Sequence, residues 1–132
     1  MMNLSNSSWG TFKWLLPALA WLIVIVILST RASVPMPSFN LMAPDKLGHA
    51  AAYGILGWLI LWGLRRGLSS GMLGYAHFIG TFVFATAFGV LMEWVQYAFF
   101  PGRFYEFDDM LANAAGAAIA CFVMPRIRRL SP

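Results

Sequence analysis

The chain has 132 residues, of which 60% are hydrophobic and only 11% are charged, and its formal net charge is +4. Six tryptophans, eleven phenylalanines and a mean hydropathy of +0.70 exclude an ordinary soluble domain and indicate an integral membrane protein. The excess basic residues flank apolar segments, which is typical of a topology signal and of contact with anionic lipid headgroups. We therefore expect no nucleic-acid partner.

Four apolar segments are close to the roughly 17–25 residues that a membrane-spanning helix needs. In chain order they are Phe12–Ser29, Lys46–Leu64, Tyr75–Phe100 and Asp108–Met124. The connectors between them contain turn and breaker residues, and an open sheet cannot span a bilayer because its edges would leave backbone groups unpaired. The sequence predicts one domain over residues 1–132, an all-α integral membrane bundle of four helices.

The first segment also has the outline of a secretory signal peptide, because Lys13 precedes an apolar run that ends near Ala32. Arg31 stands beside the would-be cleavage site and favours a retained helix. With four spans both termini share one side, and the side richer in Lys and Arg is cytoplasmic. The basic residues of the richer side are Lys13, Arg65, Arg66, Arg126, Arg128 and Arg129, and those of the other are Arg31, Lys46 and Arg103. We expect both termini in the cytoplasm.

Polar side chains gather near the outer ends of the last three segments, although such groups cost several kcal/mol in hydrocarbon. Helical spacing puts those of each segment on one stripe: Asp45, Lys46, His49 and Tyr53 in the second, Glu93 and Gln96 in the third, Asp109 and Asn113 in the fourth. At about 1.5 Å per residue, His49 and Asn113 lie about one turn in and Glu93 about two. We expect adjacent layers of one outward-facing pocket.

Small residues in the fourth segment recur at the spacing of one helical face. Ala112, Gly116 and Ala120 form this stripe. Small residues at every fourth position let two membrane helices approach closely. The stripe predicts close packing of the fourth helix on a neighbour, which would hold the pocket walls together.

The same residues carry a resemblance to a known family. D-K-x-x-H begins at Asp45, E-x-x-Q at Glu93, P-G-R at Pro101 and D-x-x-x-N at Asp109, with Gly116 beyond. Together, over about Asp45–Gly116, these motifs resemble the VanZ-like membrane proteins. The resemblance implies a small multi-helix protein of the bacterial plasma membrane, with some relatives linked to resistance to glycopeptides such as teicoplanin. It implies no established reaction.

One position departs from the family pattern. An aromatic residue often follows the histidine of D-K-x-x-H, whereas Ala50 stands here. We expect the smaller side chain to widen that end of the pocket.

Several of these residues also have structural explanations. Lys46 and Arg103 can extend to the outer interface, with their stems in the apolar region. Asp45 can cap the second helix, and Asp108 or Asp109 the fourth. Polar side chains such as Gln96 and Asn113 can simply join helices. Glu93 is the hardest to explain this way, because a carboxylate at its depth must be protonated, paired or hydrated.

The favoured hypothesis is a site for an anionic or lipid-linked headgroup at the outer leaflet, such as an envelope lipid or a cell-wall intermediate. Lys46 and Arg103 would clamp a phosphate or carboxylate. If the site is catalytic, His49 is the general base, oriented by Asp45 or Asp109, and Glu93 the general acid. The catalytic candidates are His49, Glu93 and Asp109, and the substrate-binding candidates are Asp45, Lys46, Tyr53, Gln96, Arg103 and Asn113.

Other interpretations stay open. The polar groups can form a hydrogen-bond network in a non-enzymatic accessory or sensor protein, or a proton relay in a transporter. The aromatic residues of Phe99–Phe107 can form an interfacial belt or guide an acyl or isoprenoid chain. His49, Glu93 and Asp109 can also bind zinc or manganese, but they come from three helices and their spacing assigns no metal or other cofactor. The sequence does not decide between an enzyme and a binding protein, and it assigns no oligomeric state.

Overall fold

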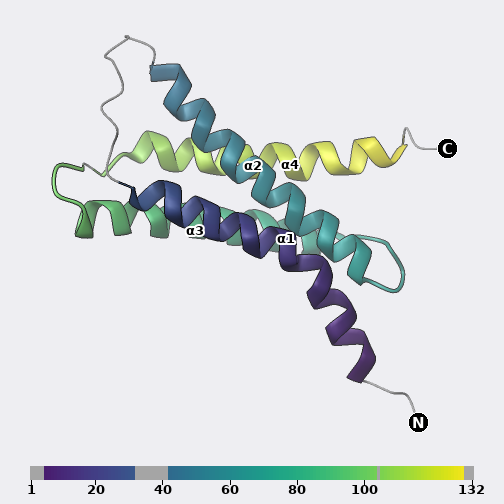
Figure 1. Ribbon diagram of the computed structural model, residues 1–132. Coiled ribbons are helices and arrows are strands. Elements are labelled where there is room, and N and C mark those ends of the chain that lie inside the picture. Colours follow the sequence, from purple (N-terminus) through teal and green to yellow (C-terminus); the bar gives the residue numbers. More distant parts are fainter. Residues whose placement is uncertain (1–4, 32–41, 104, 130–132) are drawn as a thin grey trace.

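The computed structural model describes residues 5–31, 42–103 and 105–129, with the backbone alone at 5–9, 11, 42–45 and 126–129. Over these ranges the chain forms four helices (Figure 1): α1 (Ser5–Thr30), α2 (Met42–Gly67), α3 (Tyr75–Phe99) and α4 (Phe107–Arg129). The predicted all-α class with four helices is confirmed.

Each helix contains a segment that is long and apolar enough to cross a membrane. These segments are Phe12–Thr30, Lys46–Gly67, Tyr75–Phe99 and Phe107–Pro125. The largest difference from the predicted spans is in the second, which runs on to Gly67 instead of ending at Leu64. Large apolar side chains such as Ile23, Val83 and Ile119 are exposed on the outside of the bundle, as lipid contact requires.

α2 and α4 form the most extensive helix pair, and small residues make their close approach possible. A Cβ added to Gly54 of α2 would lie 3.3 Å from the carbonyl oxygen of Gly116, and one added to Gly57 would lie 3.1 Å from the Cβ of Ala120. A Cβ on Gly116 would collide with the backbone of Ala50. Gly116 and Ala120 therefore bring α4 onto α2, which confirms the predicted close packing of this stripe.

α1 lies against α2 and α3 and bends partway along its length (Figure 1), with Pro17 inside the helix. Trp21 of α1 donates from Nε1 to the carbonyl oxygen of Ala52 in α2, at 2.8 Å. Nearer its N-terminus, the backbone of Trp14 approaches Gly63 of α2 so closely that a Cβ there would not fit. The two helices are thus joined on both sides of the proline.

The buried core is where residues of all four helices meet. It consists of Ile25, Tyr53, Leu56, Ala85 and Ala117. Because these side chains come from all four helices, the core packs α1 and α3 against the tightly packed α2–α4 pair. That arrangement fixes where the polar stripes of α2, α3 and α4 face one another.

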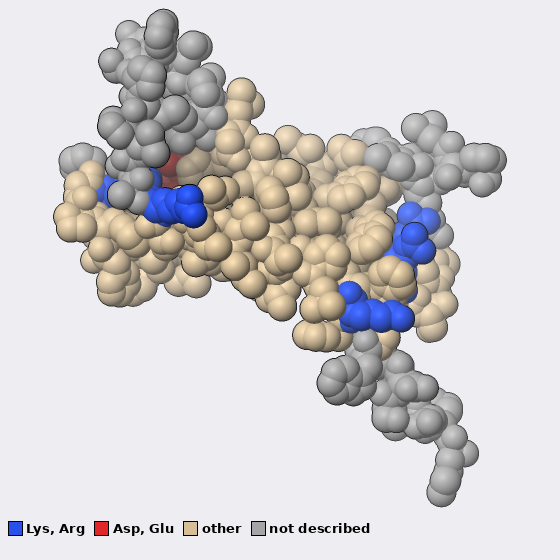
Figure 2. Space-filling model, viewed as in Figure 1, with Lys and Arg blue, Asp and Glu red and all other residues tan. Residues whose placement is uncertain are grey.

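The two ends of the bundle differ in composition. The C-terminal end of α1, the N-terminal end of α2 and the α3–α4 connection lie at one end, opposite the α2–α3 connection and both termini (Figure 1). In the view of Figure 2, basic residues are visible at both ends and acidic residues at one. At the end near the termini, Arg66 lies 5.5 Å from the ring centre of Trp14 and 5.7 Å from that of Trp62. Which end faces the cytoplasm stays a prediction.

Candidate functional site

Asp109 is the centre of a polar network that joins α2 to α4. Its carboxylate is 5% exposed and lies between two side chains of α2. Lys46 Nζ is 3.4 Å from Oδ1, and His49 Nε2 is 3.4 Å from Oδ2. Lys46 also lies 3.6 Å from Asp108 Oδ2. Two acids at the start of α4 therefore hold the one lysine at the start of the α2 span.

The other ring nitrogen of His49 is held by Asn113. His49 Nδ1 lies 3.1 Å from Asn113 Oδ1. An amide oxygen only accepts hydrogen bonds, so Nδ1 carries the proton and donates it, and Nε2 faces Asp109. Asn113 is 1% exposed, and it fills the space left by Gly89 of α3, where an added Cβ would lie 2.9 Å from Asn113 Nδ2. The orientation of the imidazole is thus fixed by two buried groups of α4, one of which packs against α3.

Glu93 of α3 faces the same cluster from the third side. It is 3% exposed, and its carboxylate makes no hydrogen bond or ion pair within residues 5–31, 42–103 and 105–129. Three potential metal-ligand atoms lie within 4.8 Å of one another, one each from His49, Glu93 and Asp109. The structure therefore brings the three catalytic candidates together, as the helical stripes predicted.

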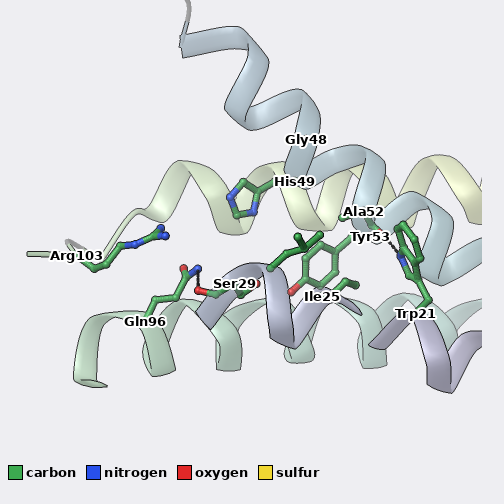
Figure 3. A pocket seen from close by; sticks show the side chains of 10 residues that line it. Trp21, Ile25, Ser29, Gly48, His49, Ala52, Tyr53, Gln96 and Arg103 are labelled. Carbon is green, nitrogen blue, oxygen red and sulfur yellow. Dashed lines mark hydrogen bonds between the residues drawn. The ribbon is translucent and has the colours of Figure 1, made fainter. Parts of the chain in front are cut away.

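An open pocket of about 320 Å³ lies beside this cluster, between α1, α2 and α3 (Figure 3). Its lining residues are Trp21, Ile25, Leu28, Ser29, Gly48, His49, Ala52, Tyr53, Gln96 and Arg103. His49, Gln96 and Arg103 gather toward the end with the α3–α4 connection, and the guanidinium of Arg103 points toward His49 (Figure 3). Trp21 and Ile25 lie at the opposite side of the pocket (Figure 3). The pocket thus has a polar end and an apolar end.

Gln96, at the polar end of the pocket, links two helices. Its Nε2 donates to the carbonyl oxygen of Ser29 at 2.9 Å, which ties α3 to the last turn of α1. Arg103 comes from the α3–α4 connection, and its guanidinium makes no hydrogen bond or ion pair with any part of the chain that the structure describes. The polar end therefore offers one unengaged cation beside a hydrogen-bonded amide.

The sequence-predicted residues divide between the pocket and the network. His49, Tyr53, Gln96 and Arg103 line the pocket, whereas Lys46, Glu93, Asp109 and Asn113 lie in the network beside it. The side chain of Asp45 and residue Phe104 of the aromatic loop lie outside the described residues. The pocket residues of α1 were missed, and the one signal for them is Trp21, an amphipathic ring in the middle of a span rather than at its end.

Two expectations about local structure are wrong. α2 begins at Met42 and α4 at Phe107, so neither Asp45 nor Asp108 or Asp109 is an N-cap. The amide of Asp109 donates to the carbonyl oxygen of Glu106, three residues back instead of the four of α-helical pairing, and this starts the helix ahead of both acids. The acids of α4 still lie in its first turn, where the helix dipole favours them.

Ala50 does not line the pocket as expected. Its backbone packs against Gly116, so this position belongs to the α2–α4 contact.

Comparison with known proteins identifies the family of the chain. The model of the VanZ/LLP1 family matches residues 8–128. This range contains most of α1 and all of α2 and α3, and extends beyond the motifs that carry the resemblance. No curated protein and no solved structure matches the chain. With a match over nearly its whole length and four helices suited to a membrane, the chain belongs to the VanZ/LLP1 family of membrane proteins.

Proposed function

We propose that the pocket between α1, α2 and α3 binds an anionic envelope lipid or a lipid-linked cell-wall intermediate at the outer leaflet of a bacterial plasma membrane. The observation that carries this proposal is the division of one pocket into a polar end, with His49, Gln96 and Arg103, and an apolar end, with Trp21 and Ile25. An amphiphile is the ligand class that satisfies both ends, because it pairs a polar headgroup with an apolar chain.

The size of the pocket suits a headgroup and the first part of its chain. Ligand sites span roughly 300–1,000 Å³, and this pocket, at about 320 Å³, is at the small end of that range. Leu28, which lines it, is also 61% exposed on the outside of the bundle. The remainder of a long chain would therefore stay in the surrounding bilayer.

Arg103 is the group that would hold the anion. A planar guanidinium can bind a phosphate or carboxylate through two parallel hydrogen bonds, and this one makes no hydrogen bond or ion pair within residues 5–31, 42–103 and 105–129, although its charge acts on Glu93. Lys46, the other predicted clamp, is already held by Asp108 and Asp109. We therefore give Lys46 the role of positioning Asp109, and Arg103 the role of binding the headgroup.

The orientation of the pocket rests on the positive-inside rule. The pocket lies at the end opposite both termini (Figures 1 and 3), and the basic residues predicted to be cytoplasmic are near the termini and the α2–α3 connection. An outward-facing lipid site also agrees with the link that the family resemblance implies to resistance against glycopeptides such as teicoplanin, which act at the cell envelope.

The test measures lipid retention by the purified protein. Wild type and variants are reconstituted in nanodiscs containing phosphatidylcholine with either phosphatidylglycerol or a polyprenyl phosphate, and native mass spectrometry counts the lipids that stay bound. Arg103→Ala is expected to weaken retention of the anionic lipid about 10–100-fold, since a hydrogen bond to a charged group is worth about 1.5–3 kcal/mol.

Arg31→Ala is the matched control. It removes an exposed arginine at the end of α1, which does not line the pocket, so it is expected to retain lipid like wild type. Equal losses in both variants would mean that the lipid responds to surface charge alone, and the proposed site would be wrong. Mass analysis of the same lipids after incubation separates binding from catalysis by His49 and Glu93, because an enzyme releases a chemically altered lipid.

A second candidate is a non-enzymatic accessory or sensor protein, in which the polar groups only fix the helices. It is favoured by the connected contacts from Lys46 through Asp109 and His49 to Asn113, which join α2 to α4. In that case Asn113→Ala lowers thermal stability and membrane abundance, while Arg103→Ala leaves lipid retention unchanged. Proton transport is the least favoured function, because the acids whose side chains are described lie at one end of the bundle, with none leading to the other.

A further inference from the structure

Two groups of the polar network have no satisfactory partner: the buried carboxylate of Glu93 and Nε2 of the partly exposed His49. The carboxylate of Glu93 is 3% exposed and has no hydrogen bond or ion pair in the described part of the chain. His49 donates its Nδ1 proton to Asn113, so in the neutral imidazole Nε2 presents a lone pair to the carboxylate of Asp109. In that tautomer two electron-rich groups face each other, and either a second ring proton or a bound cation must lie between them.

The spacing of these atoms fits a bound metal ion. His49 Nε2 and Asp109 Oδ2 are 3.4 Å apart, which is longer than the usual length of about 2.7–2.9 Å of a charge-assisted hydrogen bond and equal to the distance between Lys46 Nζ and Asp109 Oδ1. Two ligands of one tetrahedral metal, each bonded at roughly 2.0–2.1 Å, lie about 3.3–3.4 Å apart. With Glu93 included, the three potential ligand atoms lie within 4.8 Å of one another, so a small closure would complete the site.

The charges of the cluster also favour a divalent cation. Lys46 lies beside Asp108, Asp109 lies beside the imidazole, and Glu93 is buried opposite them. With Nε2 unprotonated, Lys46 and Arg103 oppose the carboxylates of Glu93, Glu106, Asp108 and Asp109, which leaves two negative charges among these six groups. A divalent cation between His49, Glu93 and Asp109 cancels them, which matters because an uncompensated charge is costly away from water.

The groups around the cluster orient these atoms as supporting residues do in metal sites. The ring nitrogen of a metal-binding histidine that does not face the metal usually donates to a carbonyl or carboxylate, and here Nδ1 donates to Asn113 Oδ1 at 3.1 Å. Lys46 engages Oδ1 of Asp109, which leaves Oδ2 directed to His49. We propose that His49 Nε2, Glu93 and Asp109 form a three-ligand site for a divalent transition metal ion of the Zn²⁺ or Mn²⁺ type.

Three protein ligands leave a coordination position open for water or another oxygen ligand. His49 also lines the lipid pocket, so an ion on its Nε2 would lie at the polar end of that pocket. A phosphate oxygen of the headgroup would be a suitable ligand for the open position. This last step rests on the proposed lipid site, whereas the metal site stands without it.

The test measures metal binding in the absence of added lipid. Purified protein in detergent is treated with a chelator, exposed to Zn²⁺ or Mn²⁺, desalted, and analysed for bound metal by mass spectrometry. Wild type is expected to retain about one ion per chain, and His49→Ala, Glu93→Gln and Asp109→Asn are each expected to lose it. Asn113→Ala keeps all three ligands. It is expected to raise the dissociation constant for the metal about 10–100-fold, as the loss of a supporting group does.

His77→Ala is the control. It removes the other histidine, at the start of α3, and is expected to bind metal like wild type. Chromatographic homogeneity and helical circular dichroism show that each ligand variant is folded, and Zn²⁺ should raise the thermal midpoint of wild type but not of these variants. Wild type that retains neither ion, or ligand variants that retain as much as wild type, would overturn the site and leave His49 as a protonated partner of Asp109. Lipid retention by Arg103→Ala is measured separately, so either proposal can fail alone.

Discussion

Gly116→Ala is expected to destabilise the bundle strongly, although it adds only one methyl group. The new Cβ would lie 2.9 Å from the Cα and 2.8 Å from the carbonyl carbon of Ala50, and would overlap its carbonyl oxygen. Ordinary van der Waals contact begins near 3.4 Å, so relieving the carbon contacts alone requires α4 to retreat from α2 by about 0.6 Å, and relieving the overlap with the carbonyl oxygen requires more. A gap of that size forfeits about a quarter of the dispersion energy of each atom pair it separates.

The magnitude follows from what the methyl group meets. Overpacking a well-packed core typically costs about 1–3 kcal/mol, and here the obstacle is the backbone of a second helix, which cannot rotate away as a side chain can. We expect a loss at the upper end of that range. The same displacement would draw His49 away from Asn113 and Asp109, since the three span the α2–α4 contact.

Thermal unfolding in detergent, followed by the fluorescence of the six tryptophans, measures the effect. Gly80→Ala is the control, because a Cβ there meets nothing within 4 Å, and it is expected to be neutral or slightly stabilising. A Gly116→Ala protein that unfolds at the same temperature as Gly80→Ala would refute the inference that the α2–α4 contact sets the stability of the bundle.

Three further substitutions test contacts around the pocket by the same unfolding assay. Trp21→Phe keeps a ring but removes the donor to Ala52, and is expected to cost about 0.5–1.5 kcal/mol; no loss would show that water or lipid replaces this bond. Gln96→Ala should cost a similar amount by releasing Ser29, and should also weaken lipid retention, so normal retention would remove Gln96 from the site. Asn113→Leu should cost about 1–3 kcal/mol because His49 Nδ1 loses its acceptor, and a stabilised variant would show that the amide is dispensable.

Much of the network could be predicted because an α-helix fixes the relative positions of residues one turn apart. His49, Asp109 and Asn113 lie near the same end of the bundle, and the expected depths brought them into one layer. Glu93 was expected one turn deeper, yet it faces the same cluster. A carboxylate oxygen of Glu93 lies within 4.8 Å of potential ligand atoms of His49 and Asp109. The regular spacing of an α-helix and a common membrane boundary were therefore sufficient to predict this part of the site.

The part of the pocket that comes from α1 could not be predicted in the same way. Ile25 and Leu28 are apolar residues in an apolar span, and no residue type distinguishes a side chain that lines a pocket from one that faces lipid. Their position depends on how α1 crosses α2, which is set by close contacts such as those of Trp14 with Gly63. Similarly, the pairing of Lys46 with two acids depends on the three-dimensional distance between α2 and α4, so the sequence left Lys46 available to a ligand.

The exposed apolar side of the pocket affects how an amphiphile would reach it. Leu28 lines the pocket and is 61% exposed, in a segment suited to the membrane interior. An amphiphile can therefore enter by lateral diffusion within the leaflet, without first dissolving in water. Occupancy would then follow the mole fraction of that amphiphile among its neighbours in the bilayer. Competition assays should accordingly vary membrane composition at fixed total lipid, because dilution into buffer would leave the relevant concentration unchanged.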